Sequence, residues 1–229
     1  MGKRQDTRDK IERSIVELGR RHLVTDGAAG LSVRAIARDL GMVSSAVYRY
    51  VASRDDLLTL LLVDAYTELA DAVDEARSEF EGAGGTWRER ILAMARAARC
   101  WAVEHPAAWA LLYGSPVPGY HAPSESTVGP GTRVVGALFG VIAEGIASGE
   151  IPSTNAVVAE PISSDFDRIR AEFAFDGDDS TVTKCFLLWA ALVGAISLEV
   201  FGQYGADTLS DPEKVFASQI ELLLASFTS

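Results

Sequence analysis

The chain has 229 residues, of which 48% are hydrophobic and 23% charged, and its formal net charge is -11 at pH 7. These proportions are typical of a folded globular protein and exclude a chain that stays disordered because it lacks apolar residues. The length is compatible with one large domain or with two smaller ones.

The first predicted elements are three helices near the N-terminus. Apolar residues recur at helical spacing over residues 8–25. A second helix is predicted over residues 33–40, because Ser32 can serve as its N-cap and Gly41 as its stop signal. A third helix is predicted over residues 45–50, after a turn of three residues.

A long helix is predicted to begin after Ser53, which forms a capping pattern with Asp56. Its apolar stripe continues to Phe80, and the glycines that follow should end the helix at about residue 82. No linker separates this helix from the three before it. We therefore expect it to connect two parts of the protein.

The middle of the chain predicts shorter helices and one long loop. Thr86 and Glu89 have the spacing of a capping box, which begins a helix to about residue 104, and Pro106 then forces a kink or a restart. Residues 114–131 contain four prolines and four glycines and are expected to form a loop. Further elements are predicted as a helix over 134–147, a connection over 149–164 and a short helix over 165–175.

The last two helices are predicted over residues 181–201 and 211–227, the second with Asp211 as its N-cap. Residues 185–201 are almost entirely apolar, which raises the question of membrane insertion. This run is shorter than the roughly 20 residues that span a bilayer, and it contains Glu199. We therefore expect a helix buried in protein on all sides and no membrane association.

The charge is segregated along the chain. Residues 1–50 carry ten basic and six acidic residues, whereas the remainder carries 11 basic and 26 acidic residues. A basic head joined to an acidic body is typical of a nucleic-acid-binding protein. Chance asymmetry between solvated faces is the alternative.

Cys100 and Cys185 stand alone, so neither a disulfide framework nor a metal site is expected. The N-terminal segment lacks the apolar core of an export signal. Both observations indicate a cytoplasmic location. The histidines are few, and we find no Gly-rich phosphate loop, GxSxG elbow or HExxH motif, so we expect neither an enzyme nor a cofactor.

The residues over 33–47 fit a helix-turn-helix. Two short helices that cross closely need a small residue at the crossing, a residue that tolerates positive φ in the turn, and an apolar anchor in the second helix. Counting Val33 as position one, Ala37, Gly41 and Val47 supply these at positions five, nine and fifteen. The match lies inside the basic region, which favours a DNA-reading motif.

The segment LSVRAIARDLGMVSSAVYRYVASRDDLL is very similar to the DNA-binding domain of the tetracycline-repressor (TetR) family. This resemblance is strong over residues 8–62, and a weaker one links the sequences at 101–120 and 189–202 to an actinobacterial type of regulatory domain in that family. It implies an all-α fold. An N-terminal three-helix helix-turn-helix domain over residues 1–52, with its motif at about 32–51, would be followed by a helical ligand-binding and dimerisation domain over 53–229.

The resemblance also implies which residues contact DNA. They are Arg34, Ser44, Ser45, Ala46, Tyr48, Tyr50 and Arg54. The small residues would open the recognition helix and approach base edges, and the tyrosines and Arg54 would bind phosphates. For Tyr50 a place in the core is the alternative. Two serines and an alanine offer few groups for direct base readout. Lys3 and Arg4 could form a minor-groove arm or a basic tail.

Large rings are expected to line an apolar pocket in the body of the protein. They are Trp101, His105, Trp109, Tyr113, Phe139 and Trp189. Packing in the core is the alternative for each of them. By resemblance, the last two helices would pair with those of a second copy, and the homodimer would bind a near-palindromic site in double-stranded DNA.

The predicted function is therefore a ligand-responsive transcription regulator, a repressor released from a palindromic operator by a small and largely apolar molecule. Two alternatives stay open. One is a transcription activator of the same family, and the other is a helical small-molecule-binding protein without a regulatory DNA site.

Overall fold

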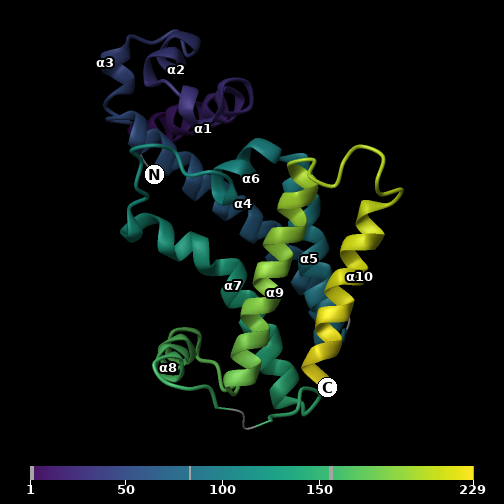
Figure 1. Ribbon diagram of the computed structural model, residues 1–229. Coiled ribbons are helices and arrows are strands. Elements are labelled where there is room, and N and C mark those ends of the chain that lie inside the picture. Colours follow the sequence, from purple (N-terminus) through teal and green to yellow (C-terminus); the bar gives the residue numbers. More distant parts are fainter. Residues whose placement is uncertain (1–2, 83, 155–156, 229) are drawn as a thin grey trace. The chain divides into compact units, whose positions relative to one another are not determined.

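The computed structural model describes residues 3–82, 84–154 and 157–228. Within these ranges the chain forms α-helices and one 3-10 turn, with no β-strand, so the fold is all-α (Figure 1). The elements are α1 (Lys3–Gly30), α2 (Val33–Asp39), α3 (Ser44–Val47), α4 (Arg54–Gly82), α5 (Trp87–Glu104), α6 (Pro106–Tyr113), α7 (Ser124–Ala147), α8 (Ile162–Phe173), α9 (Asp179–Val200), α10 (Pro212–Ala225) and η1 (Ser226–Thr228).

The helices form two compact units. The N-terminal unit comprises Met1–Glu68 and His105–Gly131, and the C-terminal unit comprises Leu69–Glu104 and Thr132–Ser229. α4 and α7 therefore each begin in the N-terminal unit and continue in the C-terminal one. The two compact units therefore do not divide at residue 52, where the sequence predicts the domain boundary.

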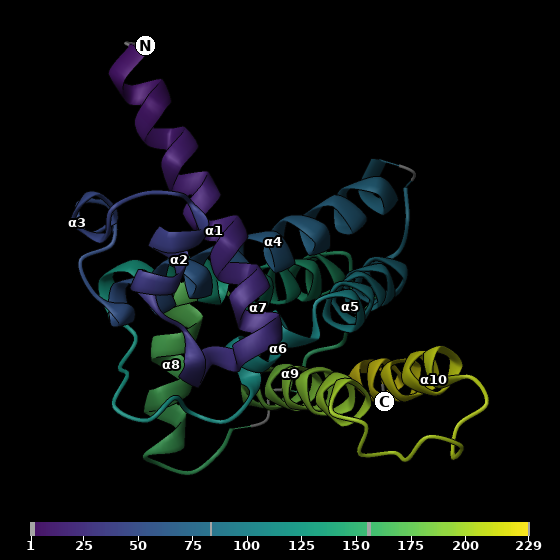
Figure 2. The same ribbon diagram turned by 90° about the horizontal axis from the view of Figure 1, so that it is seen from above.

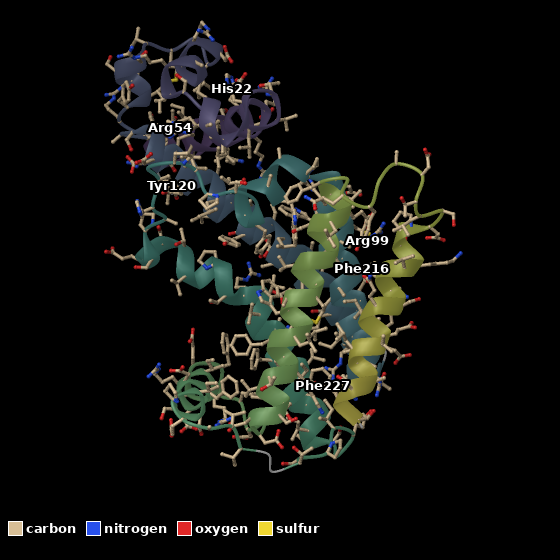
Figure 3. All side chains as sticks on the ribbon, in the orientation of Figure 1. His22, Arg54, Arg99, Tyr120, Phe216 and Phe227 are labelled. Carbon is tan, nitrogen blue, oxygen red and sulfur yellow. The ribbon has the colours of Figure 1, made fainter. Side chains whose placement is uncertain are left out.

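The N-terminal unit extends beyond residue 52 because α4 and α6 share its core. Leu57, Leu58 and Leu61 of α4 are buried together with residues of α1, α2 and α3, and Leu111 of α6 packs against them. In the segment after α6, the hydroxyl of Tyr120 lies 2.9 Å from the hydroxyl of Thr59 on α4 (Figure 3).

The N-terminal ends of α4, α5 and α10 follow the predicted capping signals. The amide of Asp56 donates to the hydroxyl of Ser53 at 3.0 Å. Thr86 and Glu89 form both bonds of the capping box, from the Thr86 amide to the Glu89 carboxylate at 2.8 Å and from the Glu89 amide to the Thr86 hydroxyl at 3.3 Å. Asp211 accepts a hydrogen bond from the amide of Lys214 at 3.0 Å. These caps could be predicted from the sequence because each involves residues within one turn of helix.

The prediction of a loop over residues 114–131 is wrong in its second half. α7 begins at Ser124, and Pro130 lies inside it. The hydroxyl of Thr127 donates to the carbonyl oxygen of Pro123 at 2.8 Å, and the Thr127 side chain is buried. Gly131 lies against the ring of Tyr66 on α4. Packing in the N-terminal unit therefore keeps helical a segment whose composition favours a loop.

α1 is also longer than predicted and is interrupted near its end. It extends over 28 residues, and Gly27 within it has non-helical angles of φ 68° and ψ 173°. Glycine can adopt this conformation without the steric penalty of a Cβ atom. The residues after Gly27 therefore leave the axis of the preceding helix.

In the C-terminal unit, α5, α9 and α10 pack against one another, and α9 and α10 run side by side (Figures 1 and 2). One face of α9 is buried, but Phe186 and Leu187 of this helix are 47% and 52% exposed, so the expected burial on all sides is wrong for the single chain. From α5, the Arg99 guanidinium donates two hydrogen bonds to the carboxylate of Glu199 on α9, at 2.8 and 2.6 Å. Glu199 is thus paired inside this unit.

Two helices among the described residues, α7 and α9, are long and apolar enough to cross a membrane by length and composition alone. α9 has 22 residues, more than the apolar run seen in the sequence. Core helices of soluble proteins also meet this criterion, so it is weak evidence. The buried face of α9 and the ion pair of Glu199 fit packing within protein.

Candidate nucleic-acid interface

The helix-turn-helix is built as its spacing predicts. Ser32 caps α2 by accepting a hydrogen bond from the amide of Ala35 at 3.4 Å. Gly41 in the turn has a φ of 66°, a conformation that favours glycine. Ala37 and Val47 are completely buried. The crossing, the turn and the anchor of the motif are therefore all present, and α3 is held on a packed core.

α3 lies at the edge of the N-terminal unit, next to α2 (Figure 2). Of the residues predicted to approach DNA, Arg34 and Ser45 are exposed, and Ser44 and Ala46 are half-buried. Tyr48 directly follows α3 and is 39% exposed. These side chains come from α2, α3 and the turn after α3, and they form the candidate reading surface.

Val43 belongs to the same surface and was missed by the sequence analysis. It is the N-cap residue of α3, and its side chain is 71% exposed. The sequence pattern predicts the start of the helix at residue 45, which leaves Val43 in the turn. The signal that could have identified it is an apolar residue at a position where a capping side chain is usual.

Tyr50 takes part in the packing of the N-terminal unit, which was the alternative to a phosphate contact. Its ring is half-buried and packs against the core of the N-terminal unit. The guanidinium of Arg8 on α1 lies 5.9 Å from the centre of the ring. The side chain therefore helps to hold α1 against the segment after α3.

Arg54 occupies a place that the sequence did not predict. Its guanidinium donates hydrogen bonds to the carbonyl oxygens of Ala28 and Ala29, at 2.9 and 3.1 Å (Figure 3). A cation at the C-terminal end of a helix interacts favourably with the exposed carbonyls there. In this structure Arg54 therefore ties the start of α4 to the end of α1.

His22 forms a second tie, between α1 and α2, that the sequence analysis missed (Figure 3). Its Nε2 atom lies 2.7 Å from the carboxylate of Asp39, and its Nδ1 atom lies 3.3 Å from that of Asp26. The hydrogen bond to His22 lowers the pKa of the Asp39 carboxyl. The backbone of Lys3 and Arg4 is in α1, but the side chains of the expected minor-groove arm lie outside the described residues.

The six rings predicted to line a pocket are divided between the two units. His105, Trp109 and Tyr113 belong to the N-terminal unit, and Trp101, Phe139 and Trp189 belong to the C-terminal unit. Two surface cavities formed by described residues have volumes of about 480 and 840 Å³, and none of these six residues lines either of them. The predicted pocket therefore remains a prediction.

In the N-terminal unit, Trp109 is completely buried, and its ring centre lies 4.4 Å from that of Tyr113. Tyr113 meets Tyr66 edge to face, with 6.3 Å between ring centres. Burial raises the pKa of both tyrosine hydroxyls, and it raises that of Tyr113 well above its ordinary value. Trp109 is thus part of a packed aromatic group.

In the C-terminal unit, Phe139 is buried against two other rings. It stacks on Phe173 with 5.0 Å between ring centres, and it meets Phe175 edge to face at 4.9 Å. This group holds α8 and the residue pair after it against α7. Within the described part of the chain, no group of three or more His, Cys, Asp or Glu side chains is placed to bind a metal ion.

Comparisons with known proteins found a matching family model and related transcription regulators. Residues 91–223 match the family model of the tetracyclin repressor-like C-terminal domain. The chain is 66% identical over 225 residues to an HTH-type transcriptional regulator of Mycobacterium tuberculosis, covering 98% of this chain and 95% of the relative. An HTH-type transcriptional regulator of Saccharopolyspora erythraea is 32% identical over 120 residues, which are 52% of this chain and 46% of the relative.

Solved structures show the same fold. The crystal structure of one regulatory protein matches with a TM-score of 0.76 and 28% identity, covering 98% of this chain and 100% of the other. The transcriptional regulator FadR of Bacillus subtilis, in complex with stearoyl-CoA, matches with a TM-score of 0.65 and covers 93% of this chain and 97% of the other. Because its identity is 15%, this second likeness shows the fold alone.

Proposed function

Since the chain belongs to the tetracycline-repressor (TetR) family and is a DNA-binding transcription regulator rather than an enzyme, we propose that it is a repressor. It binds a palindromic operator as a homodimer, and a small molecule releases it. The site of action is the bacterial cytoplasm, where the chromosome lies.

The proposal rests mainly on the reading surface, which lies on the packed core of the N-terminal unit. Ala37 and Val47 are completely buried, while Val43 at the start of α3 is 71% exposed. A recognition helix uses its N-terminal residues to contact base edges in the major groove. The ties made by Arg54 and His22 hold α1, α2 and α4 together beneath it.

The homodimer is supported by an apolar stripe on α9. Leu187, Leu198 and Phe201 are 52%, 40% and 41% exposed and follow helical spacing, with Ala190 and Gly194 between them. Leu222 on the neighbouring α10 is 76% exposed. A second copy of the chain would cover these side chains. The small residues Ala190 and Gly194 at the centre of the stripe would permit close approach of the two helices. One helix-turn-helix binds weakly, and a dimer doubles its contacts.

The many buried aromatic side chains support an apolar effector. The residues proposed to respond to it are still Trp101, His105, Trp109, Tyr113, Phe139 and Trp189. FadR of Bacillus subtilis, which shares the fold, was solved with stearoyl-CoA, a molecule with a long apolar chain. A ligand of that general character fits an aromatic lining.

Release from the operator by the effector is supported by the position of α4 in both units. α4 begins under the reading surface at Arg54 and continues beyond Glu68 into the C-terminal unit. A displacement of the second part of α4 would be transmitted to its first part because both lie in one helix. The two reading surfaces of a dimer must be about one DNA turn apart, roughly 34–36 Å, so a small displacement disrupts both contacts.

The test is a gel shift with DNA from upstream of the chain's own gene, together with transcription from that promoter. We expect a specific complex, competed by unlabelled upstream DNA but not by unrelated DNA, and less transcription when the protein is added. A specific complex that raises transcription would identify an activator. Absence of any specific complex, with a folded protein, would favour the small-molecule-binding alternative.

A further inference from the structure

Val43 is a strongly exposed apolar side chain at the start of α3. It is 71% exposed, although the residues on both sides of it along the motif, Met42 and Val47, face the core of the N-terminal unit. It forms no side-chain cap on α3. Ser, Thr, Asn or Asp at this N-cap position would stabilise the helix by accepting a backbone hydrogen bond.

Val43 directs its side chain into solvent, as its 71% exposure shows. Its angles are φ -67° and ψ 139°, an extended conformation, and its carbonyl oxygen accepts the amide of Ala46 at 2.9 Å. The side chain therefore leaves the protein at the N-terminal end of α3. That end is the part of a recognition helix that approaches base edges.

The side chains that follow Val43 are shorter. Ser44, Ser45 and Ala46 each end one heavy atom or fewer beyond Cβ. The two γ-methyl groups of Val43 are thus the principal apolar surface at this end of α3. In the major groove the apolar group presented by a base is the 5-methyl group of thymine.

We propose that Val43 determines part of the operator sequence by packing against the 5-methyl group of a thymine in each half-site. The proposal rests on the proposed DNA-binding function and adds to it a specificity residue and the base that it selects. It also explains how a recognition helix with few polar side chains can discriminate between bases.

The experiment begins by selecting the preferred duplex from a random-sequence DNA library with the full-length wild-type protein. Each thymine of the selected duplex is then replaced in turn by deoxyuridine, which lacks only the 5-methyl group. Affinities are measured for the wild type and for Val43→Ala, which removes both γ-methyl groups. Because Val43 is exposed, the variant is expected to fold, and thermal unfolding checks this.

At one thymine in each half-site, loss of the 5-methyl group should weaken wild-type binding about fourfold, the equivalent of about 0.8 kcal/mol for one buried carbon group. With Val43→Ala the same replacement should have no effect. A library selected with Val43→Ala should also lose the preference for thymine at that position.

Val24→Ala is the matched control, because Val24 is 72% exposed but lies on α1, outside the helix-turn-helix. This variant should respond to every replacement as the wild type does. If Val43→Ala weakens binding to all duplexes equally, or keeps the wild-type response at every thymine, the proposal for Val43 is wrong while the DNA-binding function stands. If the wild type binds no duplex selectively, both proposals are wrong.

Discussion

Among single residues, Arg54 has the chemistry to bind a phosphate, but in this structure its guanidinium binds the two carbonyls at the end of α1, at 2.9 and 3.1 Å. Binding a phosphate would need the same guanidinium N–H donors that bind these carbonyls. Arg54 therefore has a stabilising role in the N-terminal unit whatever its role on DNA. The position of a phosphate ligand cannot be inferred from the side chain alone.

Replacing Arg54 with alanine should lower the free energy of unfolding by about 1 kcal/mol. Hydrogen bonds of charged groups contribute about 1.5–3 kcal/mol, and partial exposure of this side chain reduces that value. Urea unfolding measures the change. Arg49→Ala is the control, because Arg49 is exposed in the same segment, and its loss should change stability by less than about 0.5 kcal/mol. Equal stability of the two variants would contradict the role assigned to Arg54.

At the scale of helices, the N-caps of α9 and α10 are both aspartates but have different numbers of partners. Asp211 accepts one backbone hydrogen bond, from Lys214 at 3.0 Å. Asp178 accepts the amides of Thr181 and Thr154, at 2.8 and 2.7 Å. Asp178 therefore both caps α9 and fixes the segment before α8.

We expect Asp178→Ala to lower the free energy of unfolding by about 2 kcal/mol and Asp211→Ala by about 1 kcal/mol, because losing a cap alone typically costs about 1 kcal/mol. Urea unfolding of the two variants at neutral pH measures both. Equal losses for the two variants would show that the bonds from Thr154 contribute nothing.

The contribution of Asp178 should depend on pH. Burial raises its pKa, but the hydrogen bonds from Thr181 and Thr154 outweigh this and hold the pKa well below its ordinary value of 3.8. A group whose pKa is lower in the folded state supplies stability that is fully present above its ordinary pKa and is lost as the pH falls below it. The stability difference between the wild type and Asp178→Ala should therefore be constant near neutral pH and shrink below pH 3.8. A difference that grows on acidification would contradict the assignment.

The elements that could be predicted from the sequence are those whose signals are local. The caps at Ser32, Ser53, Thr86 and Asp211 follow from residues within one turn, and Gly41 follows from the geometry of the turn. The start of α7 depends on packing between residues far apart in the sequence, so counting prolines and glycines gave a loop.

The candidate site was predictable to a lesser degree. The spacing of the motif identified α2 and α3, but the partners of Arg54 and the exposure of Val43 depend on tertiary structure. The rings could not be assigned to a pocket, because aromatic residues at helical spacing serve a core equally well. Trp109 and Phe139, for example, pack against other rings.

For the whole molecule, the exposure of each residue in the apolar run decides which of them can test the dimer. Val193 and Ile196 stand out in the apolar run, but Ile196 is completely buried and Val193 half-buried. A charge at Ile196 would disrupt the core of the C-terminal unit. Leu187 is 52% exposed on the proposed dimer stripe and tests the interface itself.

Leu187→Asp should convert the dimer into a folded monomer, because an unpaired charge in an apolar interface is strongly unfavourable. Sedimentation at micromolar concentration measures the mass, and circular dichroism checks the helical fold. Val157→Asp is the matched control, since Val157 is 80% exposed outside the stripe, and this variant should remain a dimer. A wild-type monomer would contradict the proposed assembly.

The central claim is that two copies of the reading surface bind one palindromic operator. The most direct test compares the affinity and stoichiometry of the wild-type protein on the selected duplex with those on a duplex in which one half-site is scrambled. We expect two chains on the intact duplex, at least about 100-fold weaker binding to the single half-site, and an affinity that falls with salt by about 0.9 decades per phosphate contact for each decade of salt. One chain per duplex, with equal affinity for both DNAs, would contradict the account.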